Sequence, residues 1–239
     1  QTDRSNQRTT ELRTLAGLSD GDVVLLAGST QDPEEQYAVD IYKRLAPVHP
    51  NLRLILVPRH PHRFDEVAAM LDQSDVAWQR RSLLAPAMRS IAASEVSDET
   101  TTACDSRDAT HRRWSVLLVD TMGELGAWWG AATIGFVGGS FGSRGGQNML
   151  EPAAYGVATC FGPNTWNFRD IVGQLLNADG ARVVTDAAEF EAFVLRMLER
   201  PQDAAELGDR ARRLVLSQQG ATRRTGELLC GLVNQYATT

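Results

Sequence analysis

Short apolar runs rich in branched side chains alternate along this chain with longer stretches that have the apolar period of a helix. The short runs are continuous rather than alternating, as strands buried on both faces require. Strands are predicted at 22–27, 52–57, 76–80, 115–119, 134–137, 157–161 and 181–185. Helices are predicted between most of them, at 34–45, 63–71, 125–132, 149–155 and 167–176. This order predicts an α/β fold, a doubly wound parallel sheet with helices on both faces.

After residue 185 the pattern is helical only, over 187–199, 202–217 and 221–236. We therefore predict a sheet domain at 21–186 and C-terminal helices at 187–239 that pack on the same domain. The segment 90–113 is rich in Ser, Thr, Asp and Glu, which predicts a mobile surface loop. Residues 1–20 open on Gln1 and are polar. We expect them to be a lead-in from an N-terminal domain of a longer protein.

The composition excludes several classes of partner. A formal charge of −6 over 239 residues gives no basic surface of the kind that nucleic acids need. The longest apolar runs, such as 23–27, are far shorter than the roughly 20 residues of a membrane span. The three cysteines are scattered without the spacing of zinc ligands. We expect a soluble chain that binds no nucleic acid and no metal.

Ligands of open parallel sheets bind beyond the carboxyl ends of the strands, so the loops there carry the functional information. After the first strand, the small residues 27–30 allow a ligand to approach the backbone, although a tight turn capped by Asp32 explains them equally well. After the second strand, Arg59 stands between Pro58 and Pro61. Two prolines stiffen the loop and aim the guanidinium at a phosphate or carboxylate. A surface salt bridge is the alternative role of Arg59.

Two further loops have the composition of anion sites. After the fourth strand, the N–H groups of Gly123 and Glu124 are candidate donors, although the Glu124 side chain also suits a helix N-terminus. After the fifth strand, five glycines occur within the nine positions 138–146. We interpret them as a loop whose amides wrap phosphate oxygens before a helix near Asn148. Glu151, in that helix, is expected to accept two sugar hydroxyls, with an exposed carboxylate as the alternative. The loop matches neither the P-loop nor the dinucleotide fingerprint.

Together these motifs resemble the C-terminal half of the 3-deoxy-D-manno-octulosonic acid (Kdo) transferases. The resemblance rests on 27–30 with Glu34 and Glu35, 57–61 with Arg63 and Phe64, 120–125, 136–140, Gly145, Gly146, Asn148, 150–153, Gly162, Pro163, Asn167 and Phe168. It spans nearly the whole strand-and-helix region in the order of the family. The chain departs from the family at Phe141, Gln147 and Met149, where Leu, His and Pro are usual.

The resemblance implies a GT-B glycosyltransferase, built of two Rossmann-like domains that face a cleft, with this chain as the half that binds the donor CMP-Kdo. It implies that the donor is bound by Pro58, Arg59, Met122, Gly123, Glu124, Gly139, Ser140, Asn148, Met149, Leu150 and Glu151. It further implies an inverting transfer of Kdo to a lipid A precursor, without a metal or other cofactor. The general base and the acceptor site are expected in the N-terminal domain, so no catalytic residue is expected in this chain.

The resemblance also implies that the whole enzyme works at the cytoplasmic face of the inner membrane in lipopolysaccharide biosynthesis, and that this chain alone is inactive. Two other functions remain open. A GT-B transferase or epimerase with a UDP-sugar donor would keep the fold and change the base. A non-catalytic nucleotide-binding or protein-interaction domain would keep the fold and lose the reaction.

Overall fold

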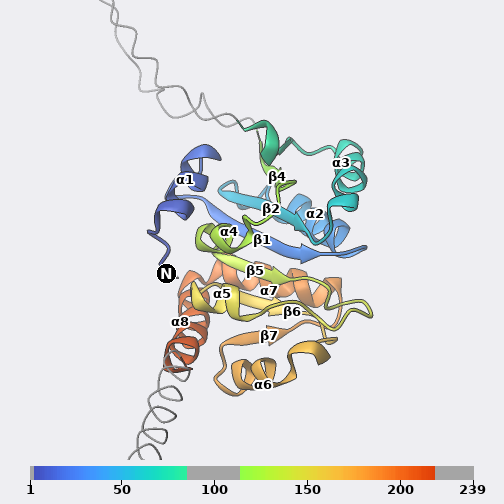
Figure 1. Ribbon diagram of the computed structural model, residues 1–239. Coiled ribbons are helices and arrows are strands. Elements are labelled where there is room, and N and C mark those ends of the chain that lie inside the picture. The colour runs from blue at the N-terminus through green and yellow to red at the C-terminus, as the bar shows by residue number, and fades with distance from the viewer. Residues whose placement is uncertain (1–2, 85–113, 219–239) are drawn as a thin grey trace, which may run out of the picture.

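The computed structural model describes residues 3–84 and 114–218, and these form one parallel sheet covered by helices on both faces (Figure 1). The strands are β1 (Val23–Thr30), β2 (Leu52–Pro58), β3 (Trp78–Arg80), β4 (Val116–Leu118), β5 (Ile134–Val137), β6 (Ala158–Phe161) and β7 (Ala181–Val183). Their order in the sheet is β3-β4-β2-β1-β5-β6-β7, and every neighbouring pair is parallel. The predicted doubly wound fold is confirmed.

The helices divide between the two faces according to which side chains of the strands they cover. They are α1 (Gln7–Leu15), α2 (Glu34–Leu45), α3 (Phe64–Asp72), α4 (Leu125–Ala131), α5 (Leu150–Ala154), α6 (Arg169–Asn177), α7 (Ala187–Glu199) and α8 (Pro201–Gln218). Helices α2, α3 and α7 pack with Leu25 and Ala27 of β1 in one buried cluster. Helices α1, α4, α5 and α6 pack with Val24 and Leu26 in the other. Helix α8 contributes to both clusters. Successive side chains of a strand point to opposite faces, which is why β1 is apolar without interruption from residue 23 to residue 27.

Three single turns of 3-10 helix join these elements: η1 (Pro61–Arg63), η2 (Arg81–Leu83) and η3 (Trp166–Phe168). Most predicted elements agree with the observed bounds within one or two residues. The residues 27–30, interpreted as a turn, instead continue β1, whose register with β2 shifts between Gly28 and Thr30. Ser29, at that shift, has a φ of 56°, in the left-handed region. Asp32 does not cap α2, because the N-cap position is Pro33 and no side chain bonds there.

Helix α1 lies within the lead-in at 1–20, where no helix was predicted. It buries Leu12 but has little apolar surface otherwise, and its position depends on polar contacts. Asn6 caps it by accepting from the Thr9 N–H at 2.9 Å, and the Thr9 hydroxyl donates to the Ala127 carbonyl of α4 at 3.0 Å. A helix attached mainly through hydrogen bonds gives no apolar periodicity, which is the signal that sequence reasoning uses.

The described part of the C-terminal segment packs on the sheet. Helix α7 buries Phe190, Phe193 and Val194, and α8 contacts α5, β6 and α7. The helix predicted at 221–236 and the loop predicted at 90–113 lie outside the described residues. Within 3–84 and 114–218, no helix is long and apolar enough to span a membrane.

Candidate functional site

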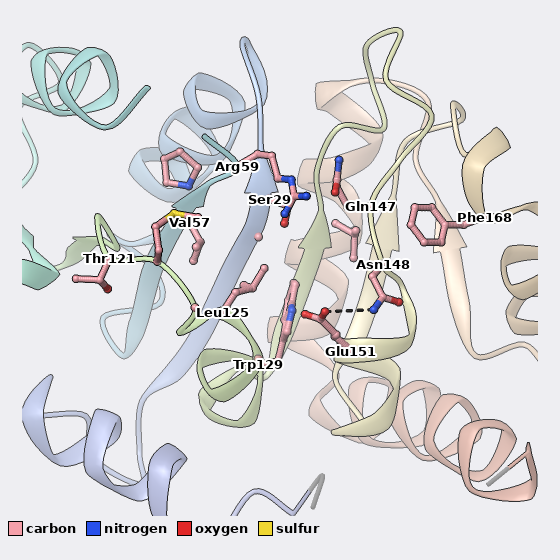
Figure 2. Close-up of a pocket in the computed structure, with 16 residues that line it drawn as sticks. Ser29, Val57, Arg59, Thr121, Leu125, Trp129, Gln147, Asn148, Glu151 and Phe168 are labelled. Atoms are coloured by element: carbon pink, nitrogen blue, oxygen red, sulfur yellow. Dashed lines mark hydrogen bonds between the residues drawn. The ribbon is translucent and has the colours of Figure 1, made fainter. Parts of the chain in front are cut away.

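A pocket of about 520 Å³ opens at the carboxyl ends of β1, β2 and β5 (Figure 2). On one side of β1 the sheet consists of β2, β4 and β3, and on the other side it consists of β5, β6 and β7. The crevice between β1 and β5 is therefore the point where the strand order reverses, which is where doubly wound sheets bind ligands. Its lining consists of Gly28, Ser29, Val57, Pro58, Arg59, Thr121, Met122, Gly123, Leu125, Gly126, Trp129, Val137, Gln147, Asn148, Glu151 and Phe168.

The pocket brings together residues from all four predicted segments, at the ends of β1, β2, β4 and β5. Six of the eleven predicted site residues line it: Pro58, Arg59, Met122, Gly123, Asn148 and Glu151. The other five lie outside the lining: Glu124, Met149 and Leu150 are next to lining residues in the chain, whereas Gly139 and Ser140 are two and three residues beyond Val137. Direct contact of any of the eleven with a ligand stays a prediction.

Arg59 is the cationic group of the pocket. Its backbone N–H donates to the Thr30 carbonyl at 3.0 Å, which attaches the loop after β2 to the end of β1. Its side chain is exposed and makes no hydrogen bond or ion pair with the described residues. Figure 2 shows the guanidinium extending across the mouth of the pocket toward Gln147. An arginine in this position is available to an anionic ligand.

The carboxylate of Glu151 and the amide of Asn148 lie on the opposite wall, at the start of α5. The Asn148 Nδ2 donates to Glu151 Oε1 at 3.2 Å, drawn as a dashed line in Figure 2, while Asn148 Oδ1 accepts from the Leu150 N–H at 3.1 Å. Glu151 makes no other side-chain hydrogen bond with the described residues, so its second oxygen is without a partner among them. A carboxylate with acceptor capacity suits ligand hydroxyl groups.

Trp129 and Phe168 supply the aromatic surface of the pocket, and neither is among the eleven predicted site residues. The Trp129 indole belongs to α4, is 1% exposed, and lies against Gly28. A Cβ on residue 28 would come within 2.5 Å of its Cζ2 atom, so glycine is needed there. The Trp129 Nε1–H has no hydrogen-bond partner among the described residues. Figure 2 shows the indole and the Glu151 carboxylate at the same end of the pocket.

Glu124 does not line the pocket but orients the loop that does. Its carboxylate accepts from Arg8 at 2.5 Å, Arg81 at 2.8 Å and the Thr121 hydroxyl at 2.7 Å. Burial alone would raise the pKa of Glu124, but the hydrogen bonds from Thr121 and Arg81 and the charges of Arg81 and Arg8 lower it below its ordinary value. No side chain caps α4, whose N-cap position is Glu124; Asp120, four residues earlier, accepts from the Ser82 N–H and hydroxyl.

The glycine-rich loop after β5 has an acceptor inside the protein. The N–H groups of Gly139, Ser140 and Phe141 donate to the carboxylate of Glu34, which is 1% exposed at the start of α2. Burial raises the pKa of Glu34, and the backbone hydrogen bonds oppose that rise. These three amides therefore have a partner without a ligand, whereas sequence reasoning expected such amides to face a phosphate.

Metal ligands are not gathered in this part of the chain. Among residues 3–84 and 114–218, no group of three or more His, Cys, Asp or Glu side chains is placed to hold an ion. His60 and His62 stack on each other with ring centroids 5.3 Å apart, beside the pocket rather than in it.

Comparisons with known proteins agree with this geometry. No family model matches the chain. A Bordetella pertussis protein named 3-deoxy-D-manno-octulosonic acid transferase is 32% identical over 90% of this chain and 45% of its own length. A Haemophilus influenzae protein of the same name is 32% identical over 86% of this chain and 43% of its own length.

Solved structures give the same result. The C-terminal CMP-Kdo binding domain of WaaA from Acinetobacter baumannii is 28% identical, with a TM-score of 0.72 over 87% of this chain and 96% of that domain. WaaG, a glycosyltransferase involved in lipopolysaccharide biosynthesis, matches with a TM-score of 0.58 at 11% identity, which shows the fold alone. The predicted GT-B type of Rossmann-like domain is confirmed. The chain is therefore a homologue of the 3-deoxy-D-manno-octulosonic acid transferases and spans a little under half the length of these two relatives.

Proposed function

We propose that this chain is the donor-binding part of a glycosyltransferase that moves Kdo from CMP-Kdo to a lipid A precursor. The observation that carries the proposal is the pocket between β1 and β5, in which an unpaired arginine faces a carboxylate and an aromatic wall. The Acinetobacter domain that resembles the chain over 87% of its length is described as binding CMP-Kdo. The lining comes from the same loops that carry the family motifs.

The chemistry of the lining suits a nucleoside monophosphate joined to a sugar. The Arg59 guanidinium pairs with the phosphate, which carries the negative charge of CMP. The Glu151 carboxylate accepts hydrogen bonds from the ribose hydroxyls, with Asn148 as its neighbour. The loop at Met122 and Gly123 lies on the wall after β4 and faces the cytosine.

The proposed reaction is a single displacement with inversion. An acceptor hydroxyl forms a bond to the anomeric carbon of Kdo while the bond from that carbon to the phosphate oxygen breaks. The hydroxyl proton passes to a general base, and CMP leaves with the electron pair. Arg59 offsets the charge that develops on the departing phosphate, which a positioned cation can do without a metal ion. We place the general base, the lipid A precursor and the contact with the cytoplasmic face of the inner membrane on the part of the enzyme that this chain does not span.

The pocket is tested by calorimetric titration of CMP into the wild type and into the double variant Arg59→Ala, Glu151→Ala. The double variant removes one positive and one negative charge, so the net charge is unchanged. We expect CMP to bind the wild type and to bind the variant at least about a hundredfold more weakly, since two hydrogen bonds to charged groups are lost.

The matched control is Arg200→Ala, Glu199→Ala, which removes the same two residue types at the end of α7, outside the pocket lining. It is expected to bind CMP like the wild type. Equal binding by the pocket variant and the control variant would contradict the assignment of this pocket to the donor.

A further inference from the structure

Glu34 connects two loops that lie on either side of the point where the strand order reverses. Each of its two carboxylate oxygens accepts two backbone hydrogen bonds. Oε1 accepts from Ser140 at 2.9 Å and Phe141 at 3.1 Å, and Oε2 accepts from Gly139 at 2.7 Å and Gln31 at 2.9 Å. The first turn of α2 thereby presents a side-chain anion to three amides more than 100 residues away in the chain.

The backbone is shaped to admit this carboxylate. A Cβ on Gly138 would come within 2.7 Å of Glu34 Oε2 and within 2.6 Å of the Thr30 Cα, so only glycine fits against both. Gly139 has a φ of 66°, a conformation that glycine adopts at little cost and that lets consecutive N–H groups converge on one anion. Two of the glycines of this loop are therefore explained by Glu34.

The same loop carries one wall of the pocket. The Gly139 carbonyl accepts from the Gly146 N–H at 2.8 Å, one residue before Gln147, and Gln147 and Asn148 line the pocket. The Ser140 carbonyl accepts from the Asn164 N–H at 3.0 Å, and the Ser140 hydroxyl accepts from the Gly162 N–H at 2.8 Å, which connects the loop to the end of β6. The bonds from Glu34 thus extend through Gly139 to the residues that face the ligand.

The Glu34 carboxylate also excludes a ligand phosphate from one part of the glycine-rich loop. The convergent amides of Gly139, Ser140 and Phe141 have the arrangement of an anion site, but Glu34 supplies the anion. A second negative charge at the same amides would meet a buried carboxylate that is 1% exposed. The phosphate of the ligand is left to the other side of the pocket, where Arg59 has no described partner.

We infer that Glu34 is a positioning residue for the donor, an internal anion that orders the glycine-rich loop before CMP arrives and so places Gln147 and Asn148 against the nucleotide. This inference rests on the proposed function. It assigns the glycine-rich loop a structural role in binding and removes the three amides from the set of phosphate ligands.

The test is Glu34→Gln, which keeps the size of the side chain and replaces one oxygen by an NH₂ group. Whichever way the amide is oriented, two of the four N–H groups lose their acceptor and face another donor. We expect hydrogen exchange at Gly139, Ser140 and Phe141 to become at least about tenfold faster and CMP to bind at least about tenfold more weakly.

Glu189→Gln is the matched control. Glu189 also lies in the first turn of a helix, and its Oε2 accepts from the backbone N–H of Thr185 at 2.7 Å, but it lies outside the pocket lining. The control is expected to change stability without changing the dissociation constant for CMP. A Glu34→Gln variant that binds CMP as tightly as the control, with faster loop exchange or without it, would overturn the inference.

A second measurement needs no variant, should Glu34→Gln fail to fold. In the wild type without CMP, the amides of Gly139, Ser140 and Phe141 are expected to exchange slowly already, because their acceptor is internal. Protection that develops only after CMP is added would show that the ligand is their partner and would overturn the inference. If the wild type binds no CMP at all, the proposed function fails and the positioning role for the donor fails with it; if the wild type binds CMP, only the inference is at risk.

Discussion

Arg81, in the turn that follows β3, has its Nη2 atom 2.8 Å from Oε1 of Glu124, in the loop that follows β4. The same oxygen accepts from Arg8 of α1. Three segments that are distant in the chain thus meet at one carboxylate beside the pocket. Because the pocket loop at Thr121–Gly123 ends at this carboxylate, its position depends on the ionised state of Glu124.

Glu124→Gln is expected to lower the free energy of unfolding by about 1–3 kcal/mol at neutral pH, through weakened hydrogen bonds to charged partners. The pKa of Glu124 is lower in the folded chain than its ordinary value of 4.5. The stabilisation is therefore present above 4.5 and is lost as pH falls through the folded-state pKa. Denaturant unfolding of both proteins across this range measures the difference.

Glu11→Gln is the control for this change, because Glu11 also pairs with Arg8, at 3.4 Å on the surface. Exposed pairs contribute about 0–1 kcal/mol. A difference between wild type and Glu124→Gln that stayed constant down to the lowest pH at which both fold would contradict the assigned role of the ionised carboxylate.

Gly28→Ala tests the contact between the end of β1 and the aromatic wall. The new methyl group would lie 2.5 Å from Trp129 Cζ2 and 3.0 Å from a methyl carbon of Leu125, so the indole has to move. Overpacking of this kind costs about 1–3 kcal/mol. We expect thermal unfolding at a lower temperature together with weaker CMP binding.

Gly173→Ala, inside α6 with nothing within 4 Å of the new methyl, is the comparison and is expected to be stabilised by about 0.5–1 kcal/mol, with CMP binding unchanged. If Gly28→Ala bound CMP as tightly as the wild type, Trp129 would not contribute to CMP binding.

Met149→Leu distinguishes a core residue from a ligand contact. Sequence reasoning placed Met149 at the donor, but its side chain is fully buried among the residues under α5 and does not line the pocket. A volume-conserving exchange in a core costs less than about 1.5 kcal/mol. We expect a small shift in thermal unfolding and the same CMP affinity by calorimetry. A tenfold loss of CMP affinity in a well-folded variant would show that Met149 contributes to the binding site.

The purified chain alone is expected to transfer no Kdo. The curated relatives are about twice its length, and the proposed base and acceptor site lie on the part that it does not span. The assay incubates the chain with CMP-Kdo and a lipid A precursor and follows the release of CMP. The control is the same assay with a full-length relative. Release of CMP that depends on the precursor would place the catalytic groups within this chain.

The fold was predictable because its signal is local. The runs at 23–27 in β1 and 54–57 in β2 are apolar throughout, and the residues that end each strand are close in sequence to the helix that follows. Arg59 and Glu151 could be proposed for the same reason, since a strand end or a helix start places them without reference to the rest of the chain.

The contacts that sequence reasoning missed join distant segments. Glu34 was recognised only as a helix start and a family motif, because its amide partners are 105 to 107 residues away. Trp129 was assigned to an apolar helix without regard to Gly28, and α1 depends on hydrogen bonds that leave no periodic pattern. Aspartate is a residue type that favours helix capping, but the Asp120 carboxylate instead accepts a hydrogen bond from the hydroxyl of Ser82, 38 residues away.

The measurement that tests the central claim most directly is calorimetric titration of CMP and, separately, of UMP into the wild-type chain. The account predicts that CMP binds at one site and that UMP binds at least about tenfold more weakly, because cytosine and uracil exchange a donor for an acceptor on the base and a site built for one leaves a polar group of the other unpaired. Equal binding of the two nucleotides, a preference for UMP, or no binding of CMP by the folded chain would contradict the claim that the pocket between β1 and β5 is a CMP-Kdo site.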